Sequence, residues 1–199
     1  MPRRGPKRPL RSAPTRQRSP AAGVHVDSEK APTELDPVSN GPDKRSAFPV
    51  VGVGASAGGL EAFGQLLRNL PVDTGMAFVL VQHLAATHES ILSSILARET
   101  RMSVREASEG MPVRPNHVYV IPPGQDMLIR DGHLELQPRT MTEGRHMPVD
   151  LFLRTLADVQ GSQSVAIVLS GTGTDGTLGC KAVKSAGGIS FAQDPASAR

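Results

Sequence analysis

The sequence predicts an α/β fold in which a doubly wound, mainly parallel sheet carries one β-hairpin insertion. Strand-like and helix-like segments alternate along the chain from Phe48 onward. The strand-like segments are almost continuously apolar, which is typical of parallel strands covered on both faces. One Asp-Gly pair between two shorter segments indicates a tight hairpin. Together these patterns describe a Rossmann-like architecture.

Short runs rich in valine and isoleucine predict the strands of the main sheet. The first contains Val50, Val51 and Val53 and runs into a glycine-rich corner. The others are expected at 76–82, 103–107, 117–121, 164–169 and 189–192. Because parallel strands need long crossover connections, the segments between them must return over the faces of the sheet.

Apolar residues at helical spacing predict three helices in these connections, and a fourth is expected after the glycine-rich loop at 170–176. We expect them near 58–70, at 89–98, from Pro148 onward and near 177–186, with proline favoured in a first helical turn. The apolar stripes are Leu60, Phe63, Leu67 and Leu70 in the first, Ile91, Leu92, Ile95 and Leu96 in the second, and Leu151, Phe152, Leu156 and Val159 in the third. The hairpin is expected at 127–136, with Asp131-Gly132 as its two-residue turn.

The first 47 residues differ in composition from the rest. Residues 1–47 hold eight prolines, ten Lys/Arg and five Asp/Glu, and have almost no apolar periodicity. Such a segment cannot bury enough apolar surface to fold, so we expect a disordered basic tail before one folded domain at 48–199. The formal net charge of +3 belongs to the tail. A basic tail can contact nucleic acid or anionic membrane, but we favour a solvated linker and expect no nucleic-acid partner.

The lack of a visible targeting signal and the cysteine usage lead us to expect a cytoplasmic protein. No window approaches the roughly 18 apolar residues of a membrane span, and no secretory signal is visible, so we expect no membrane insertion. Cys180 is the only cysteine. A single cysteine excludes an internal disulfide framework and fits a reducing compartment.

The corner Gly54-Ala-Ser-Ala-Gly58 places Ser56 between the first strand and the first helix. It fits the G-x-S-x-G pattern of a nucleophile elbow, where small neighbours let a substrate reach the hydroxyl. The overlapping run Gly52–Ala57 also fits G-x-G-x-x-A, a dinucleotide fingerprint of low specificity. That motif expects an acidic residue after the second strand, where the sequence has Gln82-His83. A glycine-rich turn without chemistry is a third interpretation.

Three reactive residue types follow three predicted strands. Ser56 follows the first strand, His83 the second, and Asp175 lies in the loop after 164–169. Because carboxyl ends of parallel strands share one edge, we expect these side chains to converge there. An imidazole can take the serine proton, and a carboxylate can fix the tautomer of the imidazole. The alternatives are that His83 is an ordinary polar residue and that Asp175 caps the following helix.

Neither a metal nor a cofactor is expected. His88, His117, His133 and His146 lack the spacing of zinc ligands, although His146 could line the cleft. The loop at 171–176 could hold a phosphate before a helix, but the carboxylate of Asp175 would repel it.

Several ordered motifs resemble the CheB-type chemotaxis protein-glutamate methylesterase catalytic domain. Its motifs are matched by Val51–Gly59, Val81–Leu84, Val118–Pro123 and Leu169–Gly176, and also by His146–Phe152 and Gln193–Ala198. The sequence at Val113–Pro123 resembles that of fusion proteins in which this domain precedes a CheR-like methyltransferase module. The family domain continues past Arg199 and usually follows a receiver domain. We therefore expect a truncated carboxyl end and regulation that does not use a receiver domain within the tail.

The resemblance implies a cytoplasmic hydrolase, acting within phosphorelay signal transduction, that demethylates glutamate methyl esters on chemoreceptor helices. It also implies that some members deamidate receptor glutamines. The family triad maps onto Ser56, His83 and Asp175, and the backbone N–H groups of Ala57 and Thr172 map onto the oxyanion hole. Many members have threonine and methionine at those last two positions. The alternatives are a catalytically weak module that docks on receptors or on a partner, and a nucleotide-binding oxidoreductase.

Overall fold

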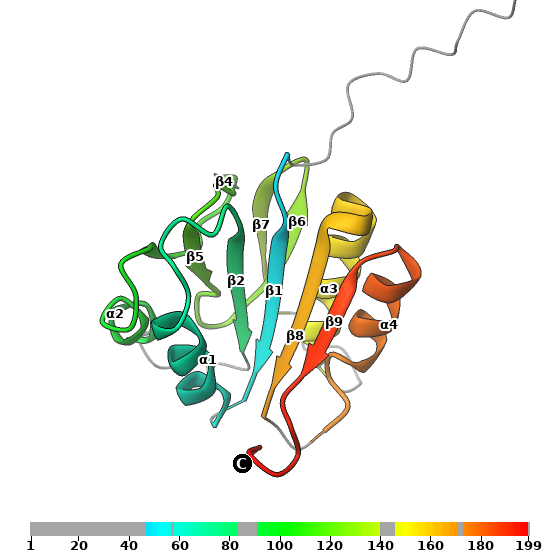
Figure 1. Cartoon of the computed structure of the whole chain (residues 1–199). Helices are drawn as coiled ribbons and strands as arrows, with labels where there is room; N and C mark the ends of the chain where they lie inside the picture. Colours follow the sequence, from blue (N-terminus) through cyan, green and yellow to red (C-terminus); the bar gives the residue numbers. More distant parts are fainter. Residues whose placement is uncertain (1–46, 57, 83–90, 140–145, 171–172, 199) are drawn as a thin grey trace, which may run out of the picture. The chain divides into compact units, whose positions relative to one another are not determined.

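The computed structural model describes residues 47–56, 58–82, 91–139, 146–170 and 173–198. Their main element is a six-stranded sheet with the order β3-β5-β2-β1-β8-β9, and all its pairings are parallel (Figure 1). The strands are β1 (Val50–Ala55), β2 (Ala77–Gln82), β3 (Ser103–Glu106), β5 (His117–Val120), β8 (Ser164–Leu169) and β9 (Ile189–Ala192). The predicted doubly wound parallel sheet is confirmed.

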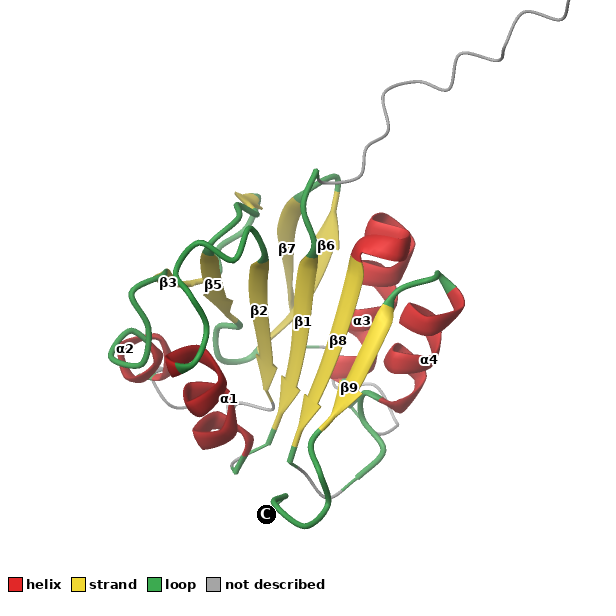
Figure 2. Cartoon of the chain, in the orientation of Figure 1, coloured by secondary structure: helices red, strands yellow, loops and turns green. Residues whose placement is uncertain are grey.

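Helices cover both faces of this sheet (Figure 2). They are α1 (Gly59–Arg68), α2 (Leu92–Leu96), α3 (Pro148–Gln160) and α4 (Thr177–Ser185), with a short 3-10 turn, η1 (Gly161–Gln163), after α3. α1 and α2 pack with one apolar cluster, and α3 and α4 pack with the other. The sheet is therefore the middle layer of three, as a βαβ alternation requires.

Strand β2 shows how the two cores divide. Phe78 and Leu80 belong to the cluster under α1 and α2, whereas Val79 and Val81 belong to the cluster under α3 and α4. All four are at most 1% exposed. Because successive side chains of a strand point to opposite faces, a continuously apolar strand is what two covered faces demand.

The glycines of β1 allow α3 to approach the sheet closely. A Cβ atom on Gly52 would lie 2.5 Å from Cδ2 of Leu153, and one on Gly54 would lie 2.4 Å from Cγ1 of Val149. Both distances are below van der Waals contact, so no larger residue fits without displacing the helix. The first turn of α3 consequently rests directly on the strand that leads to Ser56.

A smaller antiparallel sheet contains the predicted hairpin. Its strands are β4 (Met111–Pro112), β6 (Gln125–Arg130) and β7 (His133–Pro138), in the order β4-β7-β6. Asp131 and Gly132 link β6 to β7 with φ angles of 46° and 76°. Two consecutive positive φ angles are the mark of a type I′ turn, which is why Asp-Gly is favoured there.

Three details differ from the sequence prediction. The helix expected at 89–98 is only Leu92–Leu96 within the described residues, and Ile91 of its predicted stripe is 66% exposed. The buried side of α3 includes Leu153, which the predicted stripe omitted. The strand β4 was not expected, because two residues carry no periodic signal. Except for Ala47, the predicted tail at 1–47 lies outside the described residues.

Candidate functional site

The carboxyl ends of β1, β2 and β8 meet at the edge of the sheet where the connections diverge. β1 pairs with β2 on one side and with β8 on the other, and Ala55 is the register partner of both Gln82 and Leu169. The next residue of β1 is Ser56, and its backbone N–H donates a hydrogen bond to the carbonyl oxygen of Ser170 at 3.3 Å. In open α/β sheets this switch point is the usual place for a ligand.

Ser56 occupies a tight, half-buried corner between β1 and α1. Its carbonyl oxygen accepts a hydrogen bond from the N–H of Gly59 at 2.9 Å. A Cβ atom on Gly59 would lie 2.6 Å from the carbonyl oxygen of Leu169, so the start of α1 is pressed against the end of β8. Packing therefore requires a glycine at position 59. The sequence prediction that Ser56 lies on a strand-to-helix corner is confirmed.

The carboxylate of Asp175 is held by the first turn of α3. Its Oδ2 accepts a hydrogen bond from the N–H of Val149 at 3.1 Å, and its Oδ1 accepts one from the N–H of Asp150 at 2.9 Å. Free N–H groups at a helix start favour a negative charge at this position. The alternative interpretation expected Asp175 to cap the helix that follows it, α4. These hydrogen bonds instead show that its carboxylate caps α3.

Asp150 is a buried carboxylate that the sequence analysis did not single out. It is 5% exposed, and its Oδ1 accepts a hydrogen bond from the N–H of Gly179 in α4 at 2.7 Å. Its position in the first turn after Pro148 gave a signal, since acidic residues favour helix starts. Nothing in the sequence indicated that the Asp150 carboxylate would accept a hydrogen bond from a second helix.

The charge of Asp150 also affects the one cysteine of the chain. Burial raises the pKa of the Cys180 thiol, and the nearby negative charge of Asp150 raises it further, whereas Lys184 lowers it. A raised pKa keeps a thiol protonated at neutral pH, and the protonated thiol is a poor nucleophile. Cys180 is therefore a weak rival to Ser56.

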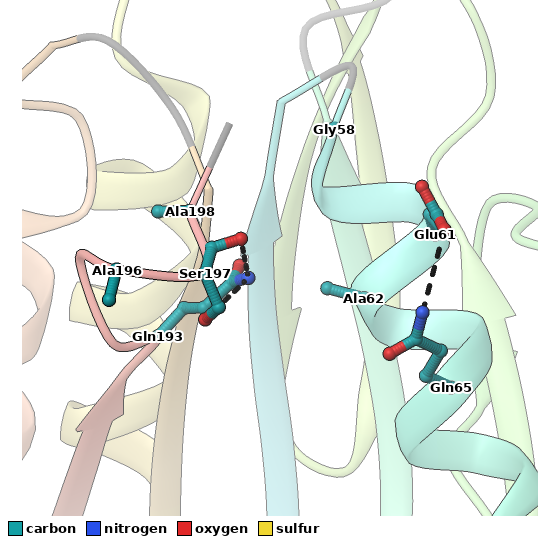
Figure 3. Close-up of a pocket in the computed structure, with 8 residues that line it drawn as sticks. All are labelled: Gly58, Glu61, Ala62, Gln65, Gln193, Ala196, Ser197 and Ala198. Atoms are coloured by element: carbon teal, nitrogen blue, oxygen red, sulfur yellow. Dashed lines mark hydrogen bonds between the residues drawn. The ribbon is translucent and has the colours of Figure 1, made fainter.

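A hollow of about 390 Å³ opens beside the serine corner. One wall is the start of α1, with Gly58, Glu61, Ala62 and Gln65, and the other is the segment after β9 (Figure 3). On that second wall the amide of Gln193 donates to the carbonyl oxygen of Ser197 at 3.0 Å, which fixes the turn. The hollow is lined largely by small and polar residues.

The described histidines have other partners. Nε2 of His146 bonds to Oδ1 of Asp126 in β6, and the His146 side chain is 20% exposed. His117 and His133 each bond through Nδ1 to a nearby backbone carbonyl oxygen. His83, His88, Ala57 and Thr172 lie outside the described residues. The structure thus brings Ser56 to the strand edge and anchors Asp175 on α3, the helix that packs against β1.

Nothing in the described residues favours a cofactor or a metal. No group of three His, Cys, Asp or Glu side chains there is arranged to hold a metal ion. Gly52 and Gly54 lie within β1 and are explained by the approach of α3, whereas a dinucleotide fingerprint needs its glycines in the turn after the strand. The described helices include none that is long and apolar enough to cross a membrane.

Comparison with known proteins gives several similar sequences. A family model described as CheB methylesterase matches residues 51–199. The protein-glutamate methylesterase/protein-glutamine glutaminase 3 of Pseudomonas syringae pv. syringae is 32% identical over 188 residues, which are 94% of this chain and 48% of that relative. The corresponding protein 2 of Xanthomonas oryzae pv. oryzae is 38% identical over 160 residues, 77% of this chain and 44% of that relative. The chain spans about half the length of these curated relatives.

One solved structure has the same arrangement. The CheB methylesterase catalytic domain of Thermotoga maritima aligns with a TM-score of 0.66 at 28% sequence identity, covering 75% of this chain and 82% of that chain. This likeness agrees with the parallel sheet and flanking helices described above.

Proposed function

The chain belongs to the CheB methylesterase family, and from that premise we propose that it hydrolyses glutamate methyl esters on chemoreceptors through Ser56, His83 and Asp175. The observation that carries this proposal is the register at the edge of the sheet. Ala55 pairs with Gln82, so the residues that follow them in the chain are Ser56 and His83. We propose that the serine and the imidazole, which follow the two members of one register pair on adjacent parallel strands, come close enough for proton transfer.

Asp175 suits the third role in this proposal. Two backbone N–H donors stabilise its ionised carboxylate, and they fix the plane in which the carboxylate can accept another hydrogen bond. A carboxylate held in this way can orient an imidazole and stabilise the imidazolium that forms during the reaction. The hydrogen bond between Ser56 and Ser170 ties the nucleophile to β8, the strand that leads into the loop of Asp175.

The proposed reaction has two steps. Oγ of Ser56 attacks the γ-carbonyl carbon while His83 accepts the hydroxyl proton, and the C–O bond to methoxide then breaks as His83 returns that proton to release methanol. Water next attacks the glutamyl-serine ester, His83 accepts its proton, and the bond to Ser56 Oγ breaks as that oxygen is protonated. Deamidation of a receptor glutamine follows the same sequence with ammonia as the leaving group.

Charge on the carbonyl oxygen must be stabilised in both steps. We assign this role to the backbone N–H groups of Ala57 and Thr172, because they follow the two strand ends that Ser56 and Ser170 join. Backbone donors tolerate a change of side chain, so alanine and threonine at these positions are compatible with an oxyanion hole.

The proposed substrate is a methylated cytoplasmic helix of a chemoreceptor. The hollow lined by Gly58 lies between α1 and the segment after β9, and we propose that a side chain projecting from the receptor helix enters there. The proposed partner includes a CheR-like methyltransferase module, on the strength of the motif at Val113–Pro123. Methyl transfer and ester hydrolysis on the same receptor glutamates are opposing reactions, so one partner supplies what the other consumes.

A methanol-release assay on methylated receptor tests the proposal. We expect turnover by the wild-type chain, a loss of about 10⁴- to 10⁶-fold in Ser56→Ala by analogy with other triads, and no loss in Ser94→Ala, an exposed serine of α2. Receptor binding without methanol release would favour a docking module instead. Retained turnover in Ser56→Ala would remove Ser56 as the nucleophile.

A further inference from the structure

We propose that Asp150 is a positioning residue that holds the catalytic carboxylate in place through α3. This inference rests on the proposed function of Asp175. It concerns a residue outside the triad and assigns a role to a buried charge that the reaction itself does not use.

The two aspartates cap each other's helices. Asp175, just before α4, accepts hydrogen bonds from the N–H groups of Val149 and Asp150 in the first turn of α3. Asp150, in that same turn, accepts a hydrogen bond from the N–H of Gly179 in the first turn of α4 at 2.7 Å. The first turn of α3 is therefore held by a carboxylate from the loop before α4, and the first turn of α4 is held by a carboxylate of α3. A shift of α4 relative to α3 would break bonds at both ends of this pair.

Close packing leaves the pair little freedom to adjust. A Cβ atom on Gly179 would lie 2.5 Å from Cβ of Leu153, so the backbone of α4 at Gly179 packs directly against the Leu153 side chain of α3. Burial of Asp150 at 5% exposure means that water cannot readily replace the Gly179 hydrogen bond. Removing the carboxylate would leave that N–H without its acceptor, and unpaired buried groups are costly.

Val149 connects this pair to the nucleophile. Its side chain lies against Gly54 of β1, two residues before Ser56, and against Gly176, the residue after Asp175. Its backbone N–H holds Asp175 Oδ2. The first turn of α3 thus touches the strand of Ser56 with a side chain and the carboxylate of Asp175 with its backbone. Its placement sets the distance between the two proposed catalytic groups.

Kinetics of variants at position 150 test this role. We expect Asp150→Ala to lower kcat by about 10- to 100-fold with KM within about threefold, because a misplacement of about 1 Å can cost that much in rate. Asp150→Asn keeps an oxygen acceptor for Gly179, so it should recover most of kcat. Asp158→Asn, on the exposed side of α3, is the matched control and should match wild type. A kcat within twofold of wild type in folded Asp150→Ala would overturn the inference, as would an effect on KM alone.

Amide resonances give a second readout that does not depend on turnover. The Val149 amide proton should move toward its position in Asp175→Ala when Asp150 becomes alanine, and it should return in Asp150→Asn. If only the Gly179 amide moves and Val149 keeps its wild-type shift, Asp150 does not position Asp175. If the wild-type chain releases no methanol but Val149 responds as expected, the proposed function fails while the mutual capping stands.

Discussion

The backbone N–H of Ser56 donates to the carbonyl oxygen of Ser170, and this hydrogen bond closes the ends of β1 and β8 beyond their last register pair. Ser170 is 9% exposed and adopts a φ angle of 40°. This left-handed conformation is unfavourable for any residue with a Cβ atom, and it turns the chain out of β8 toward the loop that carries Asp175. The strained turn therefore directs the chain from the end of β8, next to Ser56, into the loop that carries Asp175.

Substitution of Ser170 by valine should be destabilising, because a β-branched side chain fits this φ angle poorly. We expect Ser170→Val to lower the free energy of unfolding by about 1–3 kcal/mol and to reduce kcat. Chemical denaturation measures the first effect and methanol release the second. Ser103→Val in the extended strand β3 is the control and should be nearly neutral, since valine favours strands. Equal stability of the two variants would show that the turn carries no strain.

The layout of the sheet was predictable because its strands are buried on both faces. A strand covered on both faces must be apolar at every position, as in Val79–Val81. Such a run can be recognised in the sequence without knowing which segments pack against it. The hairpin was predictable because Asp131 and Gly132 tolerate positive φ angles. The position of Ser56 was predictable because the spacing of apolar residues changes there from that of a strand to that of a helix.

The relationships between distant segments were not predictable in the same way. The hydrogen bond from Gly179 to Asp150 joins residues 29 positions apart, and it depends on how closely two helices pack. Likewise, the glycines of β1 fit several motifs, and only the contact with Val149 and Leu153 explains them. Ile91 fits the predicted apolar stripe of the second helix, yet it is exposed. A stripe shows which residues share one side of a helix, but not whether another part of the chain packs against that side.

Gly54 should be intolerant of any side chain. A Cβ atom there would lie 2.4 Å from Cγ1 of Val149, so Gly54→Ala must displace the first turn of α3. We expect a loss of about 1–3 kcal/mol of stability from this overpacking, together with a lower kcat. Gly64→Ala in α1 is a matched control, because its Cβ atom would meet only the movable side chain of Glu99, at 3.3 Å. Thermal unfolding of both variants decides the matter, and similar midpoints would contradict the close approach of α3.

His83 and His146 should differ sharply in their effect on catalysis. In the proposed mechanism His83 is the base, so His83→Asn should lower kcat by at least about 10³-fold. His146 bonds to Asp126 through Nε2, and we expect His146→Asn to keep turnover within about tenfold of wild type. Methanol release by the two variants measures the contrast. A larger loss of kcat in His146→Asn than in His83→Asn would show that His83 is not the base.

The pH dependence of Cys180 alkylation should respond to two charges in opposite directions. Burial and then the charge of Asp150 raise the pKa of this thiol above its ordinary 9.0, and Lys184 lowers it. Because only the thiolate reacts, the alkylation rate of the folded chain should rise at higher pH than that of the unfolded chain. Removing a negative charge should ease ionisation, so Asp150→Asn should move the rate profile to lower pH.

Removing the positive charge in Lys184→Gln should move the same profile to higher pH, while Asp158→Asn should leave it in place. A thiol whose pKa rises on folding also contributes stability that is present below its unfolded pKa and is lost as the pH rises through the folded value. The wild-type chain should therefore lose some stability at alkaline pH relative to Cys180→Ala, as followed by denaturation across that range. Shifts of the same sign in Asp150→Asn and Lys184→Gln would mean that access to the thiol, rather than charge, controls its reactivity.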